Sequence, residues 1–264
     1  MVVEVPDLDG ETLVVTGGTS GIGKEIVLFA SKTGADVIFS YHTNEKNARE
    51  IQENTGAVPY LLALGDTNST RNFINLIKEN FSSIDYFIAN AGVELSGDLR
   101  KHNFEDISRI INANLTGNLY LLQSIITEGM MSHRGQISVI GSIAAAGNHD
   151  QLAYSASKSG LRGAIESLSR YDPIVKEQSL GVKLLEPAFV RTPMTERILK
   201  ILERRVIPKR GGDELVKRFN DEKIVMDSTY AAQEILRLTL DTKVIGIRTI
   251  PEGINLHEIR ETYF

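Results

Sequence analysis

The chain has 264 residues, of which 42% are hydrophobic, and an α/β chain of this size commonly forms a single domain, here residues 1–264. The net charge of −5 argues against nucleic acid as a partner, and the absence of cysteine excludes disulfides and thiolate metal sites. No stretch approaches the roughly 18 apolar residues of a membrane span, and the start, MVVEVPDLDG, has no basic segment, so we expect a cytoplasmic protein without membrane contact.

Short β-branched runs alternate with longer helical patterns, which is typical of a parallel sheet joined by crossover helices. Most of the runs are apolar on both faces, as expected for strands that helices cover on both sides. We predict strands at Leu13–Thr16, Val37–Ser40, Tyr60–Ala63, Tyr86–Ala89, Ile137–Ile140, Val182–Leu185 and Val244–Ile250. We predict helices at Ile22–Lys32, Glu45–Asn54, Arg71–Phe81, Phe104–Met131, Ala153–Tyr171 and Thr229–Leu240.

A glycine-rich turn, TGGTSGIGK at Thr16–Lys24, follows the first predicted strand and opens the first predicted helix. Gly17, Gly21 and Gly23 lack Cβ atoms, so they permit a tight turn and let backbone N–H groups at the positive helix end meet a pyrophosphate. The turn therefore predicts a dinucleotide site, with a spacing that differs from the commoner G-x-G-x-x-G.

The end of the second strand indicates which dinucleotide binds, because an acidic residue there would hold the ribose 2′-hydroxyl of NAD. Asp36 opens this strand and so lies at its other end. Ser40, Tyr41 and His42 lie at the carboxyl end, where they offer hydrogen-bond donors and no carboxylate that would repel a 2′-phosphate. We therefore expect NADP(H) in preference to NAD(H).

The stretch LAYSASKSG, Leu152–Gly160, places Tyr154 and Lys158 four residues apart. In a helix the two side chains share one face, about 5–6 Å apart at Cβ, so the ammonium can stand beside the phenol. Because a nearby cation favours phenolate, we expect the pKa of Tyr154 to lie well below its usual value near 10. Tyr154 then becomes an acid–base group at neutral pH, with Ser142 upstream as a candidate partner.

A charged insertion at 195–227 separates the last two predicted strands and is either a substrate lid or a packed excursion. Its run Lys200–Arg218 concentrates positive charge, and this run is either a solvated helix face or a mobile lid that attracts an anionic substrate. The histidines are scattered without a pair at metal-binding spacing, so no metal site is predicted.

Six motifs occur in one order along the chain, and together they resemble the short-chain dehydrogenase/reductase family over nearly its whole length. They are TGGTSGIG, ANAG, NLTG, the serine of IGS, YSASK and PAFVRTPM. The resemblance implies a three-layer, doubly wound Rossmann fold with a seven-stranded parallel sheet in the order 3-2-1-4-5-6-7. It also implies a cofactor across the carboxyl ends of the strands, and a homotetramer or homodimer.

The resemblance also implies site residues. The catalytic positions are Asn114, Ser142, Tyr154 and Lys158. With the end of the second strand included, the expected cofactor-binding residues are Gly17, Thr19, Ser20, Gly21, Ile22, Gly23, Ser40, Tyr41, His42, Asp66, Asn90, Ala91, Gly92, Tyr154, Lys158, Pro187, Val190 and Thr192. The chain departs from the family in ANAG, which replaces paired asparagines, in Ala188, which replaces glycine, and in PEGINL, which replaces the C-terminal D-G-G.

The implied function is an NAD(P)-dependent oxidoreductase that interconverts a secondary alcohol and a ketone by hydride transfer. Tyr154 would give the proton, Ser142 would position the carbonyl oxygen, and Lys158 would lower the phenol pKa and bind the nicotinamide ribose. Asn114 would anchor a water relay. The substrate is either a 3-oxoacyl thioester or a sugar or polyol, and the alternative is a catalytically silent dinucleotide-binding sensor or scaffold.

Overall fold

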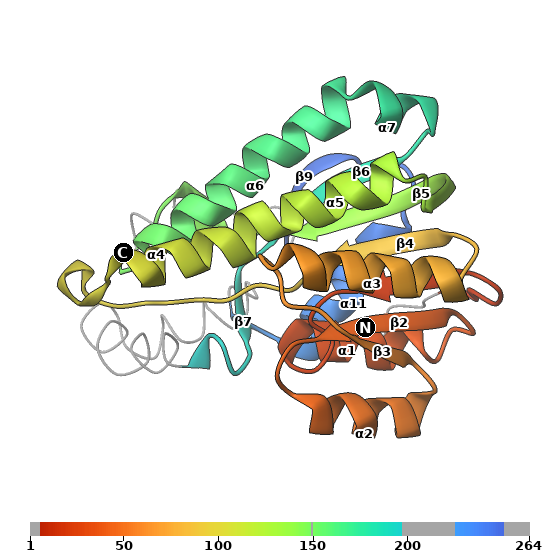
Figure 1. The fold of residues 1–264 in the computed structure, drawn as a ribbon, viewed down its shortest axis with the longest axis horizontal. Coiled ribbons are helices and arrows are strands. Elements are labelled where there is room, and N and C mark those ends of the chain that lie inside the picture. Colours follow the sequence, from red (N-terminus) through yellow and green to blue (C-terminus); the bar gives the residue numbers. More distant parts are fainter. Residues whose placement is uncertain (1–5, 149, 197–224, 251–264) are drawn as a thin grey trace.

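The computed structural model describes residues 6–148, 150–196 and 225–250, and a parallel seven-stranded sheet runs through them (Figure 1). The strands of this sheet are β1 (Thr12–Val15), β2 (Asp36–Tyr41), β3 (Val58–Leu61), β4 (Ile84–Ala89), β5 (Met131–Ile140), β6 (Gly181–Pro187) and β9 (Gly246–Ile250). Their order is β3-β2-β1-β4-β5-β6-β9. Because β9 is the seventh strand of the sheet in the chain, this order confirms the expected 3-2-1-4-5-6-7.

Helices cover both faces of the sheet and complete the three expected layers (Figure 1). One face carries α1 (Gly21–Ala30), α2 (Glu45–Thr55) and α11 (Ser228–Leu240). The other carries α3 (Thr67–Asn80), α4 (Phe104–Ile111), α5 (Gly117–Thr127), α6 (Leu152–Tyr171) and α7 (Pro173–Glu177). A separate parallel pair is formed by β7 (Phe189–Arg191) and β8 (Val225–Asp227).

The two hydrophobic cores follow directly from the alternation of side chains along each strand. In β1, Val14 belongs to the core under α3, α5 and α6, whereas Leu13 and Val15 belong to the core under α1 and α11. Side chains in a strand point alternately to opposite faces, so a strand covered on both sides must be apolar throughout. The continuous apolar run that the sequence shows here is therefore explained by burial on both faces.

The helix predicted at Phe104–Met131 is wrong in one respect, because the chain forms two helices with a π-helical turn, Asn112–Thr116, between them. The second helix ends at Thr127, and Met131 already belongs to β5. A π turn accommodates one extra residue, and such turns are frequent at functional sites. Apolar periodicity alone does not reveal it.

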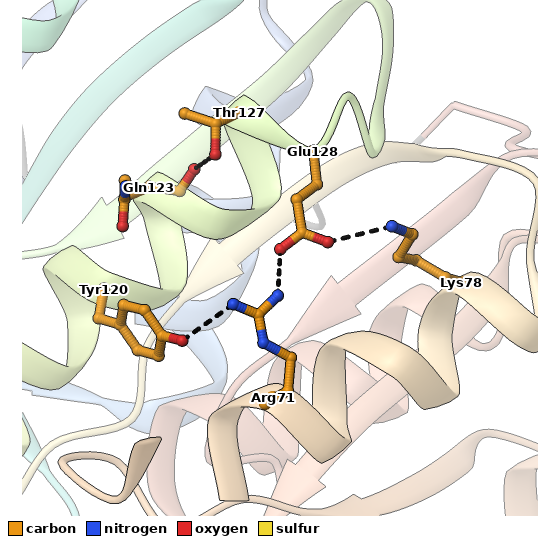
Figure 2. A network of polar contacts seen from close by, with 6 residues as sticks. All are labelled: Arg71, Lys78, Tyr120, Gln123, Thr127 and Glu128. Carbon is orange, nitrogen blue, oxygen red and sulfur yellow. Dashed lines mark hydrogen bonds and ion pairs between the residues drawn. The ribbon is translucent and has the colours of Figure 1, made fainter. Parts of the chain in front are cut away.

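A polar cluster on the surface ties α3 to α5 (Figure 2). Glu128 follows α5 and accepts a hydrogen bond from Lys78 Nζ at 3.0 Å and a second from Arg71. Arg71 also donates to the Tyr120 hydroxyl at 3.1 Å. We call these four residues the α3–α5 clamp. The hydrogen bond from Lys78 and the nearby Arg71 hold the pKa of Glu128 below its ordinary value, although burial acts in the opposite direction.

Some predicted features lie outside the described residues. They are most of the expected lid at 195–227, the whole basic run Lys200–Arg218, and the segment PEGINL, which begins at Pro251. In the ranges that the structure does describe, no helix combines the length and the apolar character that a membrane crossing requires. The same ranges hold no group of three or more His, Cys, Asp or Glu side chains placed to bind a metal ion.

Candidate active site

The glycine turn between β1 and α1 has the backbone shape that its sequence predicts. Gly17 and Gly21 have φ values of +72° and +52°, in the left-handed region that residues with a Cβ rarely adopt. A Cβ on Gly23 would lie 2.2 Å from the Gly17 carbonyl oxygen and 2.5 Å from Asn90 Nδ2. The turn is therefore packed too closely for any side chain at Gly23.

Hydrogen bonds of Thr16 and Asn90 connect the glycine turn to the loop after β4. The Thr16 hydroxyl accepts hydrogen bonds from the backbone N–H groups of Asn90 at 3.0 Å and Ala91 at 2.9 Å. In return, Asn90 Nδ2 donates to the carbonyl oxygens of Thr16 at 3.0 Å and Gly17 at 3.3 Å. The ANAG motif after β4 is thus bonded to the glycine turn after β1, although 74 residues separate Thr16 from Asn90.

These residues fit a dinucleotide pyrophosphate. Ser20 is the N-cap of α1, it is exposed, and its side chain makes no capping hydrogen bond. The N–H groups of the first turn of α1 form the positive end of the helix dipole, and the Ser20 side chain does not accept a hydrogen bond from them. Thr19 is buried and Ile22 packs against the core, so both shape the turn rather than extend into solvent.

The polar residues at the end of β2 lie at the predicted positions, but their surroundings differ. Asp36 is the first residue of β2 and pairs with Thr12, so it lies at the amino end of the strand. Ser40 is buried, and its hydroxyl oxygen accepts the Gly17 N–H at 3.0 Å, which makes it a brace for the turn. Tyr41 is half-buried and His42 is exposed, so these two residues lie where a 2′-phosphate could reach them.

Two further parts of the expected cofactor site lie at neighbouring strand ends. Asp66 follows β3 and caps α3, with its carboxylate accepting the Ser69 N–H at 2.9 Å, while the residue stays exposed. Pro187 ends β6 opposite Ile250. Val190 is buried in β7, and the methyl carbon of Thr192 would lie 3.1 Å from a Cβ on Gly21. The chain after β6 therefore closes against the glycine turn.

Asn114 lies in the π-helical turn and is completely buried. Its Oδ1 accepts the Val93 N–H at 2.7 Å, and its Nδ2 donates to the Val93 carbonyl at 2.7 Å and to Ser157 Oγ at 3.2 Å. A Cβ on Gly92 would lie 3.2 Å from Asn114 Oδ1 and 3.9 Å from Lys158 Nζ. The loop after β4, the π turn and α6 therefore meet at one point beside the lysine.

Lys158 reaches this point from α6 and is only 4% exposed. Its Nζ donates to the Ile140 carbonyl at 2.7 Å, at the carboxyl end of β5. Burial lowers the pKa of Lys158 to about 8, while the negative charge of Glu186 partly opposes this shift. The ammonium is therefore weakly solvated and easily discharged compared with a surface lysine.

Tyr154 lies one helical turn before Lys158, whose Nζ is 5.8 Å from the centre of the phenol ring. We predicted a lowered pKa for Tyr154, and this prediction is wrong. Among the groups that the chain itself supplies, burial has the largest effect, and it raises the pKa of Tyr154 to about 12. A hydrogen bond with Ser142 acts downward, and the negative charge of Glu94 acts upward. Loss of hydration and the charge of Glu94 penalise phenolate more than the Ser142 hydrogen bond stabilises it. The phenol of Tyr154 is therefore protonated at neutral pH.

Ser142 stands between β5 and Tyr154. It caps the short 3-10 helix Ile143–Ala146, with its hydroxyl oxygen accepting the Ala144 N–H at 3.1 Å. That bond fixes the side chain and leaves its O–H available to a second acceptor. Ser142, Tyr154 and Lys158 thus meet at the carboxyl end of β5, and together they can donate a proton and a hydrogen bond to a carbonyl oxygen.

Sequence reasoning missed a carboxylate behind the lysine. Glu186 lies in β6 with none of its surface exposed, and it pairs with Arg162 of α6. A Cβ on Gly141 would lie 2.9 Å from the Glu186 side chain, which therefore packs against the link between Ile140 and Ser142. The signal was present, since a glutamate in the apolar strand GVKLLEP needs a partner once it is buried.

Comparisons with known proteins identify the family to which the chain is similar. The family described as short chain dehydrogenase matches residues 11–201. The 3-oxoacyl-(acyl-carrier-protein) reductase FabG of Buchnera aphidicola subsp. Schizaphis graminum is 32% identical over 194 residues, covering 72% of this chain and 78% of that protein. The reductase of the same name from Escherichia coli is 30% identical over 195 residues, covering 73% and 78%.

Solved structures share the fold. A short chain dehydrogenase from Burkholderia cenocepacia in complex with NADP is 21% identical, with a TM-score of 0.78 over 92% of this chain and 97% of that one. BdcA in complex with NADPH is 23% identical, with a TM-score of 0.75 over 92% of this chain and 94% of that one.

Proposed function

Because this chain belongs to the short chain dehydrogenase family, we propose that it is an NADPH-dependent reductase that converts a ketone to a secondary alcohol, and the reverse, with Tyr154 as the proton donor. The observation that carries the proposal is the meeting of Tyr154, Ser142 and Lys158 at the carboxyl end of β5, beside the glycine turn. Ligands of doubly wound sheets bind at this edge.

Tyr154, Ser142 and Lys158 each have a separate part in the proposed reaction. The bound dinucleotide supplies the hydride when a ketone is reduced. Tyr154 then gives its hydroxyl proton to the oxygen of the former carbonyl, and Ser142 donates a hydrogen bond to the same oxygen. Lys158 is easily discharged, so it can return a proton to Tyr154 after the reaction.

The preference for NADPH is supported by the end of β2. No carboxylate follows Ser40 in the strand, and Tyr41 and His42 lie at the open end. The change Tyr41→Asp places an acid where it can hold a ribose 2′-hydroxyl and repel a 2′-phosphate. We expect this variant to lose affinity for NADPH and to gain affinity for NADH, measured as the ratio of KM values. An unchanged ratio would contradict the assignment of this strand end.

Two observations bear on the substrate. The relatives named 3-oxoacyl-(acyl-carrier-protein) reductase favour a 3-oxoacyl thioester. The polar side chains Asn148 and Gln151, at the start of α6, favour a hydroxylated ketone or a polyol. The homotetramer that the family resemblance implies stays a prediction, to be tested by sedimentation.

The decisive experiment follows NADPH oxidation by its absorbance against simple ketones, hydroxy ketones, sugars and acetoacetyl-CoA. We expect reduction of at least one class. Tyr154→Phe should lower kcat by about 10²- to 10⁴-fold and leave the Kd of NADPH nearly unchanged, because only the proton donor is lost. The matched control is Tyr120→Phe, which removes a surface phenol from the α3–α5 clamp and should keep full turnover.

Retained turnover in Tyr154→Phe would overturn the assignment of the proton donor. Tight NADPH binding without turnover of any substrate would instead support a dinucleotide-binding sensor or scaffold.

A further inference from the structure

A group of four polar residues lies next to the proposed catalytic site, and we call it the Glu94 wall. Glu94 and Ser96 lie in the loop after β4, Asn148 precedes α6, and Gln151 is its N-cap. Gln151 Nε2 donates to Glu94 Oε1 at 2.9 Å and to Ser96 Oγ at 3.2 Å. The Ser96 hydroxyl also bonds Glu94 Oε1, and Asn148 Nδ2 donates to Gln151 Oε1 at 2.7 Å.

Counting donors and acceptors shows what this wall offers to a substrate. A glutamine amide has two N–H donors, and both of those in Gln151 are used within the wall, as is its carbonyl oxygen. Glu94 Oε1 accepts two hydrogen bonds, one from Ser96 and one from Gln151. Among the residues that the structure describes, none donates a hydrogen bond to Glu94 Oε2, and none forms an ion pair with this carboxylate. The wall therefore presents an acceptor that bears a negative charge.

This acceptor lies close to the reacting groups. The charge of Glu94 acts on the phenol of Tyr154 and raises its pKa. Gln151, which is only 3% exposed, is the N-cap of the helix that carries Tyr154, and its Nε2 donates to Glu94 Oε1, so Glu94 is bonded to the start of this helix. The bonds from Gln151 and Ser96 hold the carboxylate in one position before any substrate arrives.

We propose that Glu94 determines substrate specificity by accepting a hydrogen bond from a hydroxyl or ammonium group beside the reacting carbonyl. The substrate is then a hydroxylated or aminated ketone, and this inference rests on the proposed reductase function. A carboxylate forms strong, charge-assisted hydrogen bonds to such donors. A 3-oxoacyl thioester has a thioester carbonyl on one side of its reacting carbonyl and an alkyl chain on the other, so neither side offers a hydrogen-bond donor to the carboxylate.

Three ketones of nearly the same shape test the proposal, because they differ only in one terminal group. Hydroxyacetone carries a hydroxyl, aminoacetone an ammonium and butan-2-one a methyl group. With NADPH-loaded wild-type protein, we expect kcat/KM for the better of the two donor-bearing ketones to exceed that for butan-2-one by about 10- to 100-fold. The donor that gives the larger ratio identifies the substrate class as a hydroxy ketone or an amino ketone.

The variant Glu94→Gln keeps the size of the side chain and removes its charge. We expect it to reduce the preference for a donor to within about threefold, and to raise the relative rate with acetoacetyl-CoA. The control Glu166→Gln removes the same charge from an exposed ion pair with Arg170, farther along α6, and should keep the wild-type preference. A preference of the same size in Glu94→Gln and wild type would overturn the inference and leave the reductase function standing.

If no ketone turns over, the proposed function fails and binding still decides the inference. The melting temperature of NADPH-loaded protein should then rise more with hydroxyacetone or aminoacetone than with butan-2-one, and Glu94→Gln should abolish the difference. Equal rises with all three ketones would overturn the proposal.

Discussion

Two regions of the molecule pair a cation with a tyrosine, and they behave differently. In the α3–α5 clamp, Arg71 donates to the Tyr120 hydroxyl while Glu128 neutralises the charge (Figure 2). In the candidate active site, Lys158 stands beside the Tyr154 ring and donates to a backbone carbonyl. The clamp faces solvent, where 46% of the Arg71 side chain is exposed, whereas Lys158 is 4% exposed.

The difference shows that hydration, more than the identity of the neighbour, sets the ionisation of a side chain. In the clamp, water stabilises the charges, and hydrogen bonds lower the pKa of Glu128 in favour of its ionised form. In the active site, burial penalises both charged forms, so the pKa of Lys158 falls to about 8 and that of Tyr154 rises to about 12. A cation beside a tyrosine therefore makes a structural contact in the clamp, whereas in the candidate active site it belongs to the pair that we propose for proton transfer.

The largest effect should come from removing Lys158, and removal of Lys78 in the clamp is the matched control. Lys158→Met should lower kcat by about 10²- to 10⁴-fold, because Tyr154 loses the group that returns its proton. Lys78→Met removes an ammonium from the clamp and should leave kcat within about twofold of wild type. Steady-state kinetics with saturating NADPH measure both. If Lys158→Met kept more than a tenth of the turnover, the two regions would not differ as described.

Buried lysines should also make stability depend on alkaline pH. Lys183 in β6 is completely buried, and its Nζ donates to the Leu238, Thr239 and Asp241 carbonyls at 2.9, 3.0 and 3.0 Å. Burial lowers its pKa to about 8 in the folded chain, whereas an unfolded lysine titrates near 10.4. Between these values the unfolded chain binds more protons, so the free energy of unfolding should rise with pH.

Urea unfolding at pH 7, 8, 9 and 10 checks this. We expect a rise on the order of 1–3 kcal/mol between about pH 8 and pH 10. Lys183→Met should make this rise smaller and leave the part that comes from Lys158. A curve that is equally steep in wild type and variant would show that the alkaline dependence has another origin.

A smaller effect should follow from the carboxylate behind Lys158. The charge of Glu186 raises the pKa of Lys158 against the effect of burial, so Glu186→Gln should discharge this lysine at lower pH. The alkaline fall in kcat/KM should then begin at lower pH than in wild type, with a loss of a few-fold near pH 8. Glu166→Gln, an exposed acid on the same helix, should leave the pH profile unchanged.

The smallest effect belongs to the clamp. The pKa of Glu128 is lowered, first by the hydrogen bond from Lys78, so its contribution to stability is present above about pH 4.3 and is lost as pH falls through the folded pKa. Exposed ion pairs contribute little, and Glu128→Gln should lower Tm by at most about 2 °C at pH 7. Calorimetry should show the difference shrinking towards acid pH and at high salt. A larger loss would mean that the clamp is as poorly hydrated as the active site.

Most of the strands and helices were predictable because local patterns report local geometry. The apolar runs placed every strand of the sheet within a few residues, except the start of β5, where Ser132, His133 and Arg134 interrupt the apolar pattern. The π turn at Asn112–Thr116 was not predictable from periodicity. Its Asn114 bonds Val93 from another element, and a Cβ on Gly117 would lie 2.5 Å from the Gly65 backbone nitrogen, so contacts from distant segments shape this turn.

The candidate site was predictable to the same extent. The glycine turn and the spacing of Tyr154 and Lys158 are local features, and the structure shows both with the shapes that sterics and helix periodicity require. Glu94 and Glu186 were missed because each acts on a residue far away in the sequence. The pKa of Tyr154 was predicted in the wrong direction because spacing measures proximity and does not measure burial.

The order of residues along the chain was therefore enough to establish a parallel α/β sheet, a turn that can receive a pyrophosphate, and a phenol one helical turn from an amine. Each of these depends on backbone geometry over a few residues. Folding decided how much water reaches Lys158 and Tyr154, and which carboxylates come near them from β6 and the loop after β4. Ionisation depends on solvation and on charges gathered from distant segments, and only the packed chain brings these together.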